Sequence, residues 1–248
     1  MERLRVATYN VHKCRGLDGR TRPERIAEVL RQMDADVVAL QEVLCVEGHP
    51  REDQAKFLAE ELGLEYAIGE NRRLKGGAYG NVILSRYPIL QSANYDVSVP
   101  GRERRGCLRA DIAWNGAVLH LFNVHLGTSY FERRQQARKL LDEQLLRSRE
   151  LNGPRIVAGD FNEYLKGLVT QLLHTEFESA DLRLYGGLKR SYPGVLPLVH
   201  LDHIYYDDDL ILESVRVHRS LLALVASDHL PVVAEFAMAH ASGTGAIW

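Results

Sequence analysis

The chain has 248 residues, 46% of them apolar, and its 31 basic and 33 acidic residues leave a formal net charge of -2. This is enough apolar material for a sizeable core, and the near-neutral charge excludes a whole-chain electrostatic attraction to nucleic acid or to an anionic membrane. The three cysteines lie far apart and form no C-x-x-C pair, which argues against a zinc or redox motif and favours a reducing compartment.

No apolar run approaches the ~20 residues that a membrane span requires, and the charged first residues lack the apolar stretch of a signal peptide. We therefore expect no transmembrane segment and a cytoplasmic location. No Pro- or Ser-rich linker and no repeat divides the chain. The sequence predicts one domain over residues 1–240 and a loose tail over residues 241–248, and it leaves the oligomeric state open.

Short segments rich in Val, Ile, Leu and Tyr predict strands along the chain. These segments are residues 4–11, 37–41, 82–85, 109–114, 118–125, 156–159, 201–205 and 232–236. The first helix follows the first strand, since Thr21 and Glu24 fit a capping box with Pro23 in the first turn and apolar residues continue at helical spacing to Met33.

Further helices are predicted over residues 52–62, with Gly63 as the C-terminal stop, over residues 130–148 and over residues 165–174. The inward face of the 130–148 helix is predicted to consist of Ala137, Leu140, Leu141, Gln144 and Leu145. Its basic run is interpreted as a solvated helix face; this run comprises Arg133, Arg134, Arg138 and Lys139. Because strands and helices alternate irregularly, the pattern favours an α/β architecture with mixed sheets over a purely parallel one.

Polar residues stand where these strands end. Asn10 shares a strand face with Thr8, Glu42 ends an apolar strand, and Asp160 and Asn162 follow another in G-D-F-N. The same holds for Asn123 and His125 in N-V-H-L, for Asp202 after Leu201, and for Asp228 and His229 before the last strand. Each alone has a structural explanation, such as a helix cap or a local backbone bond. Together they indicate one site, because buried acids are costly unless they are paired or bound to metal.

Such a set of residues suits metal-assisted hydrolysis of a phosphate ester. Glu42 and Asp228 supply the hard oxygen ligands that Mg²⁺ or Mn²⁺ prefers, and no Cys or His spacing favours zinc. Asp160 with Asn162 can orient and deprotonate a water, and Asp202 can hold His229 as a donor to a phosphate oxygen. A G-x-S-x-G motif is absent, which favours direct attack by water over a covalent intermediate.

At this point the chain resembles the endonuclease/exonuclease/phosphatase superfamily, the group of exonuclease III, DNase I and the neutral sphingomyelinases. The blocks that carry the resemblance occur in order as T-Y-N-V-H (8–12), D-V-V-A-L-Q-E-V (36–43), G-N-V-I-L-S-R-Y-P-I (80–89), N-V-H-L (123–126), G-D-F-N (159–162), L-D-H-I-Y (201–205) and S-D-H-L-P-V (227–232). The resemblance implies a four-layer α/β sandwich of the DNase I type, in which two mixed sheets pack face to face with helices outside.

The resemblance also implies roles for the residues. Glu42 would be the main metal ligand, with Asn10 and Asp228 near it, and one or two ions would bind. Asp160 and Asn162 would activate and place the water, and Asp202 with His229 would face the scissile phosphate. His125 would bind phosphate or steady the transition state. Asn81, Arg105 and Arg109 are weaker candidates for contact with substrate phosphate.

The substrate class is less defined. Exonuclease III-like repair enzymes carry Q-E-T-K at the metal-binding glutamate and W-R-x-D-Y at the dyad aspartate. This chain has Q-E-V-L and V-H-L-D-H-I-Y at these two places, which argues against repair of abasic sites. The sequence of residues 190–205 is similar to the corresponding sequence of small bacterial members of this superfamily, some of which are linked with lipid metabolism. We expect a phosphodiesterase acting on a lipid head group or another small phosphodiester. The alternatives are a nuclease, whose basic residues would lie in two loops around residues 72–75 and 102–105, and a catalytically silent binding module.

Overall fold

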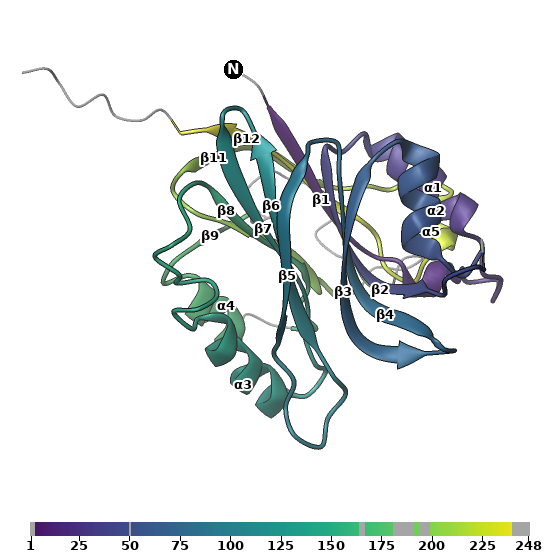
Figure 1. Ribbon diagram of the computed structural model, residues 1–248, viewed down its shortest axis with the longest axis horizontal. Coiled ribbons are helices and arrows are strands. Elements are labelled where there is room, and N and C mark those ends of the chain that lie inside the picture. Colours follow the sequence, from purple (N-terminus) through teal and green to yellow (C-terminus); the bar gives the residue numbers. More distant parts are fainter. Residues whose placement is uncertain (1–2, 50, 164–166, 181–190, 194–198, 240–248) are drawn as a thin grey trace, which may run out of the picture.

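Two packed β-sheets form the centre of the molecule, and helices cover the outer face of each sheet (Figure 1). The structure is a computed structural model, and it describes residues 3–49, 51–163, 167–180, 191–193 and 199–239. The predicted tail over residues 241–248 lies outside these ranges. Within them, no helix is both long enough and apolar enough to cross a membrane. The layer order is helix, sheet, sheet, helix, which confirms the predicted four-layer sandwich.

The first sheet has six strands among the described residues, in the order β11-β12-β1-β2-β4-β3. The strands are β1 (Leu4–Asn10), β2 (Val37–Cys45), β3 (Glu65–Leu74), β4 (Gly77–Ser85), β11 (Leu210–Val217) and β12 (Val232–Met238). β1 and β2 are parallel, and every other neighbouring pair in this sheet is antiparallel.

The second sheet has six described strands in the order β5-β6-β7-β8-β10-β9. The strands are β5 (Ile89–Asp96), β6 (Gly106–Trp114), β7 (Ala117–His125), β8 (Arg155–Asp160), β9 (Glu178–Ser179) and β10 (Asp202–Tyr206). Here β7 and β8 form the parallel pair, with antiparallel partners on both sides. Both sheets therefore repeat one pairing pattern, a central parallel pair flanked by two antiparallel strands on each side.

This pattern sets the position of the polar strand ends. β12 runs antiparallel to β1, so its first residues lie beside the end of β1, and β10 begins with Asp202 opposite Asp160 at the end of β8. The ends of β1, β7 and β8 and the starts of β10 and β12 consequently meet at one edge of the sandwich, where Gln41 of β2 lies beside the end of β1.

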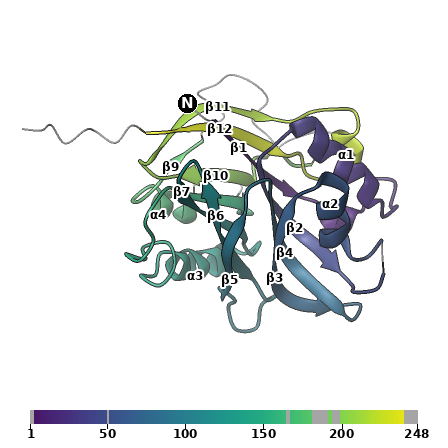
Figure 2. The ribbon, with the colours of Figure 1, turned by 45° about the horizontal axis from the view of Figure 1, so that its top comes forward.

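Three layers of apolar side chains hold the sheets and helices together. Between the sheets, residues such as Val6 and Ile83 of the first sheet pack with Leu121 of the second. α1 (Pro23–Met33), α2 (Gln54–Leu62) and the short α5 (Ala223–Ala226) cover the first sheet. α3 (Tyr130–Leu140) and α4 (Leu168–Leu173) cover the second, and Figure 2 shows the two groups of helices on opposite sides of the sheets.

The structure corrects the predicted start of the first helix. α1 begins at Pro23 with Arg22 as N-cap, and no side chain caps it, so the capping box of Thr21 and Glu24 does not form. Thr21 is engaged instead in an isolated β-bridge with Arg15, one residue before the cap position. The predicted stop at Gly63 is confirmed, since this residue takes the left-handed conformation after α2.

The third helix is also shorter than predicted, since it ends at Leu140. Beyond it, the carbonyl and side chain of Asp142 accept hydrogen bonds from the backbone N–H groups of Leu145 and Gln144, which replaces helix by turns. Leu145 is buried as predicted, but Gln144 is exposed.

Arg133 was predicted to lie on a solvated face with the other basic residues of α3. It is buried instead, and its guanidinium donates to the carbonyls of Gly127 and Thr128. Residues 165–166 of the predicted fourth helix lie outside the described ranges, and α4 occupies part of the remainder.

Candidate active site

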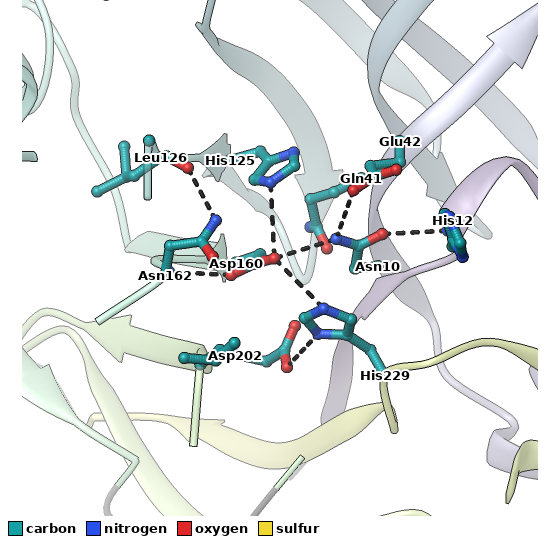
Figure 3. Close-up of polar contacts among 12 residues, drawn as sticks. Asn10, His12, Gln41, Glu42, His125, Leu126, Asp160, Asn162, Asp202 and His229 are labelled. Atoms are coloured by element: carbon teal, nitrogen blue, oxygen red, sulfur yellow. Dashed lines mark hydrogen bonds and ion pairs between the residues drawn. The ribbon is translucent and has the colours of Figure 1, made fainter. Parts of the chain in front are cut away.

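The predicted polar residues gather at one edge of the sandwich, between the two sheets (Figure 3). Asn10 ends β1, His125 and Asp160 end β7 and β8, and Glu42 lies inside β2, which continues to Cys45. A hydrogen bond of 3.0 Å from Asn10 Nδ2 to Asp160 Oδ2 joins the two sheets at this edge. The ends of β1, β7 and β8 therefore lie together here, whereas the strand predicted to end at Glu42 continues to Cys45.

A bulge in β2 directs Glu42 toward this edge. The pairing with β4 shifts between Leu40 and Val43, so Gln41 and Glu42 together oppose one residue, and Glu42 has the positive φ of 58°. Leu40 and Val43 both pack under the helices, although side chains three apart on a regular strand point to opposite faces. The extra residue allows both to be buried there while Glu42 remains beside the site.

Asp160 is the centre of the site, with 1% of its surface exposed. Its Oδ2 accepts from Asn10 and lies 3.6 Å from His125 Nε2 and 3.7 Å from His229 Nε2. Its Oδ1 accepts the backbone N–H of Asn162 at 2.9 Å. Burial raises the pKa of Asp160, against the opposing effects of the two imidazoles and Asn10. This carboxyl group is therefore more basic than an exposed aspartate.

The G-D-F-N segment bends sharply to place Asp160 and Asn162. Asn162 has a φ of 50°, a left-handed conformation that asparagine tolerates. Its Nδ2 donates to the carbonyl of Leu126 at 2.9 Å. Because the amide nitrogen is held in this way, the oxygen Oδ1 is the atom that Asn162 can offer to a water molecule.

Asp202 and His229 form the predicted dyad, with 2.9 Å between Asp202 Oδ2 and His229 Nδ1. Burial disfavours a charged imidazole, but Asp202 and Asp160 together outweigh it and raise the pKa of His229 to about 10. His229 is consequently a cation at neutral pH, and its Nε2–H faces Asp160.

Glu42 is ionised for a related reason. Burial favours its neutral form, yet His125, Lys13 and Asn10 hold its pKa at about 2. Lys13 Nζ lies 3.0 Å from Oε2, and Asn10 Nδ2 lies 3.3 Å from Oε1. Lys13 was not predicted as a site residue, although its position directly after N-V-H is a usable signal. Tyr79, also unpredicted, lies beside this carboxylate: burial first, and the charge of Glu42 second, raise the pKa of its phenol.

Asp228 completes this side of the site. Ser227 Oγ donates to the carbonyl of Asn10 at 2.7 Å, which ties the segment before β12 to the end of β1. Asp228 Oδ1 lies 3.6 Å from His12 Nδ1. Its half-buried carboxylate is therefore held at the same edge as Asn10.

His125 is buried, and both of its ring nitrogens have polar neighbours. Nε2 faces Asp160, and Nδ1 lies 3.0 Å from Nη1 of Arg105. Burial first, and the charge of Arg105 second, lower the pKa of His125 to about 4. This imidazole is therefore neutral at the pH at which His229 is charged.

Two of the three weaker candidates serve other contacts. Asn81 lies inside β4 rather than at a turn, and its Nδ2 donates to the carbonyls of Gly106 and Asn123, which links the sheets. Arg109 points to Asp111, 3.2 Å away, and to the ring of Tyr95. Among the three, the structure brings only Arg105 into contact with a residue of the site.

The acidic groups offer two places for a cation. Among the described residues, Asp160, Asp202 and His229 form the group whose ligand atoms all lie within 4.8 Å of one another. However, His229 is protonated and donates to Asp202, so it has no lone pair available for a metal. Glu42 is an ionised, partly exposed carboxylate beside the amide of Asn10, and this oxygen-rich side suits a hard cation better.

These observations define a class of structure, namely a two-sheet α/β sandwich with a buried site of acids and imidazoles at one sheet edge. The sequence profile of the endonuclease/exonuclease/phosphatase family matches residues 7–229, and the chain belongs to this family. Members of the family hydrolyse phosphoester bonds. The resemblance drawn from the ordered sequence blocks is thereby confirmed.

A curated relative and several solved structures match nearly the whole chain. The uncharacterized protein YbhP of Escherichia coli K12 is 32% identical, and the alignment covers 94% of this chain and 95% of YbhP. A family structure from Bacteroides vulgatus superposes with a TM-score of 0.79 at 18% identity and covers 96% of this chain and 100% of its own. A mannosyl-6-phosphatase from Bacteroides thetaiotaomicron gives a TM-score of 0.74 at 20% identity, with coverages of 95% and 100%. These two structures show the shared fold.

Proposed function

We propose that this protein is a divalent-metal-dependent phosphodiesterase that uses in-line attack of water on phosphorus. The observation that carries the proposal is the position of Asp160, a buried carboxylate with His125 and His229 on either side and Asn10 of the opposite sheet within hydrogen-bond distance. A buried acid with raised basicity beside a cationic imidazole provides both a proton acceptor and a proton donor.

The residues of the first sheet fit a hard cation. Glu42 is ionised and Asp228 is half-exposed, and Lys13 and Asn10 both place a nitrogen within 3.3 Å of the Glu42 carboxylate. Glu42, Asp228 and Asn10 would hold one or two ions of Mg²⁺ or Mn²⁺ through oxygen atoms. A bound ion would supply Lewis-acid stabilisation of charge on the phosphate.

Asp160 and Asn162 would prepare the attacking water. Asp160 accepts the proton that the water loses as the new bond to phosphorus forms, and its raised pKa makes it a suitable base. Asn162, fixed through Leu126, orients the same water through Oδ1. The hydrogen bond from the Asn162 backbone to Asp160 Oδ1 leaves Oδ2 as the atom that faces the site.

His229 would stabilise the transition state from the other side. Its charge is maintained by Asp202, and its Nε2–H is directed to the centre of the site. A charged hydrogen-bond donor stabilises the transition state most where negative charge develops on the non-bridging phosphate oxygens. Asp202 therefore acts through His229, which it orients and keeps protonated.

The charge around the site supports a lipid head group or another small phosphodiester as substrate. The two basic segments lie side by side, and four of their six cations are paired with acids. Arg72 and Arg105 both contact Glu103, and Arg73 contacts Glu70 at 3.6 Å.

Lys75 contacts Glu52 at 2.7 Å. A nucleic-acid surface requires many cations that are free to contact successive phosphates, and the four ion pairs reduce the number of free cations in these two segments. A nuclease remains the alternative, and it would show a steep loss of binding as salt rises.

The test is hydrolysis by the purified protein of plasmid and single-stranded DNA, RNA, sphingomyelin, glycerophospholipids and inositol phosphates, with Mg²⁺, with Mn²⁺ and with EDTA. We expect metal-dependent turnover of a lipid or small phosphodiester. Asp160→Asn should lower kcat by about 10²- to 10⁴-fold, because it removes the base.

Asp111→Asn is the matched control, since Asp111 is also buried but pairs with His120 outside the site. It should retain activity. Turnover confined to nucleic acid would replace the lipid assignment by the nuclease, and equal activity of wild type and Asp160→Asn would refute the assigned mechanism.

A further inference from the structure

Arg105 makes a contact that defines the hydrogen positions on His125. Arg105 lies just before β6, is only 8% exposed, and places Nη1 3.0 Å from His125 Nδ1. A guanidinium group has hydrogen-bond donors and no acceptor. The Nδ1 atom must therefore accept this bond with its lone pair, and the ring proton of His125 must be on Nε2.

Arg105 is held in this position by a chain of contacts that crosses from one sheet to the other. Its Nη2 donates to Glu103 Oε2 at 2.9 Å, and Glu103 Oε1 lies 3.0 Å from Arg72 Nε. The guanidinium of Arg72 lies over the ring of Tyr79, 4.6 Å from its centre. Lys13 Nζ lies 5.8 Å from the centre of the same ring and 3.0 Å from Glu42 Oε2, so the chain begins at the proposed metal side and ends at His125.

The protonated nitrogen of His125 faces the reacting centre. Nε2 lies 3.6 Å from Asp160 Oδ2, the same atom that His229 approaches from the other side. The buried position of His125 and the adjacent charge of Arg105 both disfavour a second proton on the ring. The two imidazoles therefore differ, since His125 offers a neutral N–H and His229 a charged one.

We infer that Arg105 is a positioning residue that fixes His125 as the neutral Nε2–H tautomer, so that His125 gives a phosphate oxygen a hydrogen bond without transferring a proton. The role of the tautomer in hydrolysis rests on the proposed function, whereas the tautomer itself does not. In this arrangement Asp160 is the single base at the centre of the site, and His125 does not compete with it for the proton of the water.

Direct binding of substrate phosphate by Arg105 fits the geometry less well. Its Nη1 is used by His125 and its Nη2 by Glu103, and its side chain is 9% exposed. An arginine that clamps phosphate usually presents both nitrogens of its fork to the ligand. Arg105 presents this fork to protein groups instead.

The tautomer can be measured without any substrate by ¹⁵N NMR of the histidine rings, because protonated and unprotonated ring nitrogens resonate far apart. His125→Asn assigns the His125 signals. In the wild-type protein at neutral pH, we expect an unprotonated Nδ1 and a protonated Nε2. In Arg105→Met, the ring should populate both tautomers, and Arg105→Lys should restore part of the wild-type state because lysine also donates.

Two further variants make the measurement decisive. Arg109→Met removes an arginine from β6 that contacts Asp111 and not His125, and it should leave the His125 signals unchanged. Glu103→Gln weakens the hold on Arg105 and should give a smaller shift in the direction of Arg105→Met, which covers the case that the latter does not fold. A proton on Nδ1 in the wild type, or the same tautomer in wild type, Arg105→Met and Glu103→Gln, would overturn the inference.

Kinetics on bis(p-nitrophenyl) phosphate with Mn²⁺ separate positioning from substrate binding. We expect Arg105→Met to lower kcat by about 10- to 100-fold, as the loss of a residue that orients a site histidine does, with KM nearly unchanged. A rise in KM at constant kcat would show that Arg105 binds substrate and would overturn the positioning role. Absence of turnover by the wild type would count against the proposed function alone, since the NMR result stands separately.

Discussion

At the scale of single residues, the site depends on how neighbouring groups share charge. Asp160 lies between two imidazoles that differ in charge, since His125 is neutral and His229 is a cation. Of the two, Asp202 contacts His229. The residue types were recognisable from the sequence, because Asp160, Asp202 and His229 stand at the ends of apolar strands. The hydrogen-bond partners of the site residues could not be recognised in the same way, since His125 contacts Arg105, which lies in a loop distant in the sequence.

The raised pKa of His229 predicts how stability depends on pH. Its pKa is about 10 in the folded protein and about 6.5 in an unfolded chain. Between these values the folded state holds the proton more tightly, so the contribution of His229 is complete below about pH 6.5 and is lost as pH rises through 10. Urea unfolding in EDTA should show the free energy of unfolding falling across this window in wild type.

His229→Asn lacks the titrating ring and should show a flatter dependence on pH over the same range. His218→Asn is a suitable control, because burial lowers the pKa of His218 rather than raising it. Parallel curves for wild type and His229→Asn would contradict the assigned charge of His229.

At the scale of secondary structure, the sequence predicted the central strands and missed those with polar outer faces. In β3, β5 and β11, exposed residues alternate with buried or partly buried ones, and β3 and β11 carry several charges. Burial on both faces produces the apolar runs that identify β1, β2 and β8, whereas the outer strands resemble loops. The bulge at Glu42 could not be predicted from the sequence either, because it depends on how β2 pairs with β4.

The parallel pair of β7 and β8 requires a glycine next to the site. A Cβ atom on Gly159 would come within 1.9 Å of the carbonyl oxygen of Val124, and the φ of Gly159 is 154°. We expect Gly159→Ala to push the strands apart beside Asp160 and to lose both stability and activity. Gly116→Ala is the matched control, because Gly116 also has a positive φ, but a Cβ atom at this position would have no neighbouring atom within 4 Å.

The left-handed conformation alone costs about 1–2 kcal/mol in each variant. The clash should add about 1–3 kcal/mol in Gly159→Ala only, which urea unfolding can resolve. Equal losses in the two variants would show that the strands separate without cost and that this close contact does not position Asp160.

At the scale of the whole molecule, each sheet contributes a different half of the site. Asn10 and Glu42 come from the first sheet, and His125, Asp160 and Asp202 come from the second. The family and the four layers could be predicted because the seven sequence blocks occur in the family's order, whereas the roles of the site residues remain a proposal. The length of the third helix was overestimated. Hydrogen-bonded turns around Asp142 follow its last residue, although apolar residues continue at helical spacing.

The division of the site predicts how a divalent cation affects folding. Without metal, the carboxylates of Glu42 and Asp228 lie at the end of one sheet, near the buried acids Asp160 and Asp202 of the other, and their mutual repulsion lowers stability. A cation bound to the folded state alone raises the free energy of unfolding by RT ln(1 + [L]/Kd), or about 2.7 kcal/mol at 100 times Kd. We therefore expect Mg²⁺ or Mn²⁺ to raise Tm with a saturable dose response.

Glu42→Gln separates this specific effect from general screening of charge. The substitution removes the ionised ligand and should abolish the saturable rise in Tm, while Asp208→Asn, at an exposed acid beyond β10, should keep it. Ionic screening by NaCl at matched ionic strength should act on wild type and both variants alike, because it does not depend on a defined site. If Glu42→Gln retained the full response, the cation would bind elsewhere, and the buried group of Asp160, Asp202 and His229 would become the place to look.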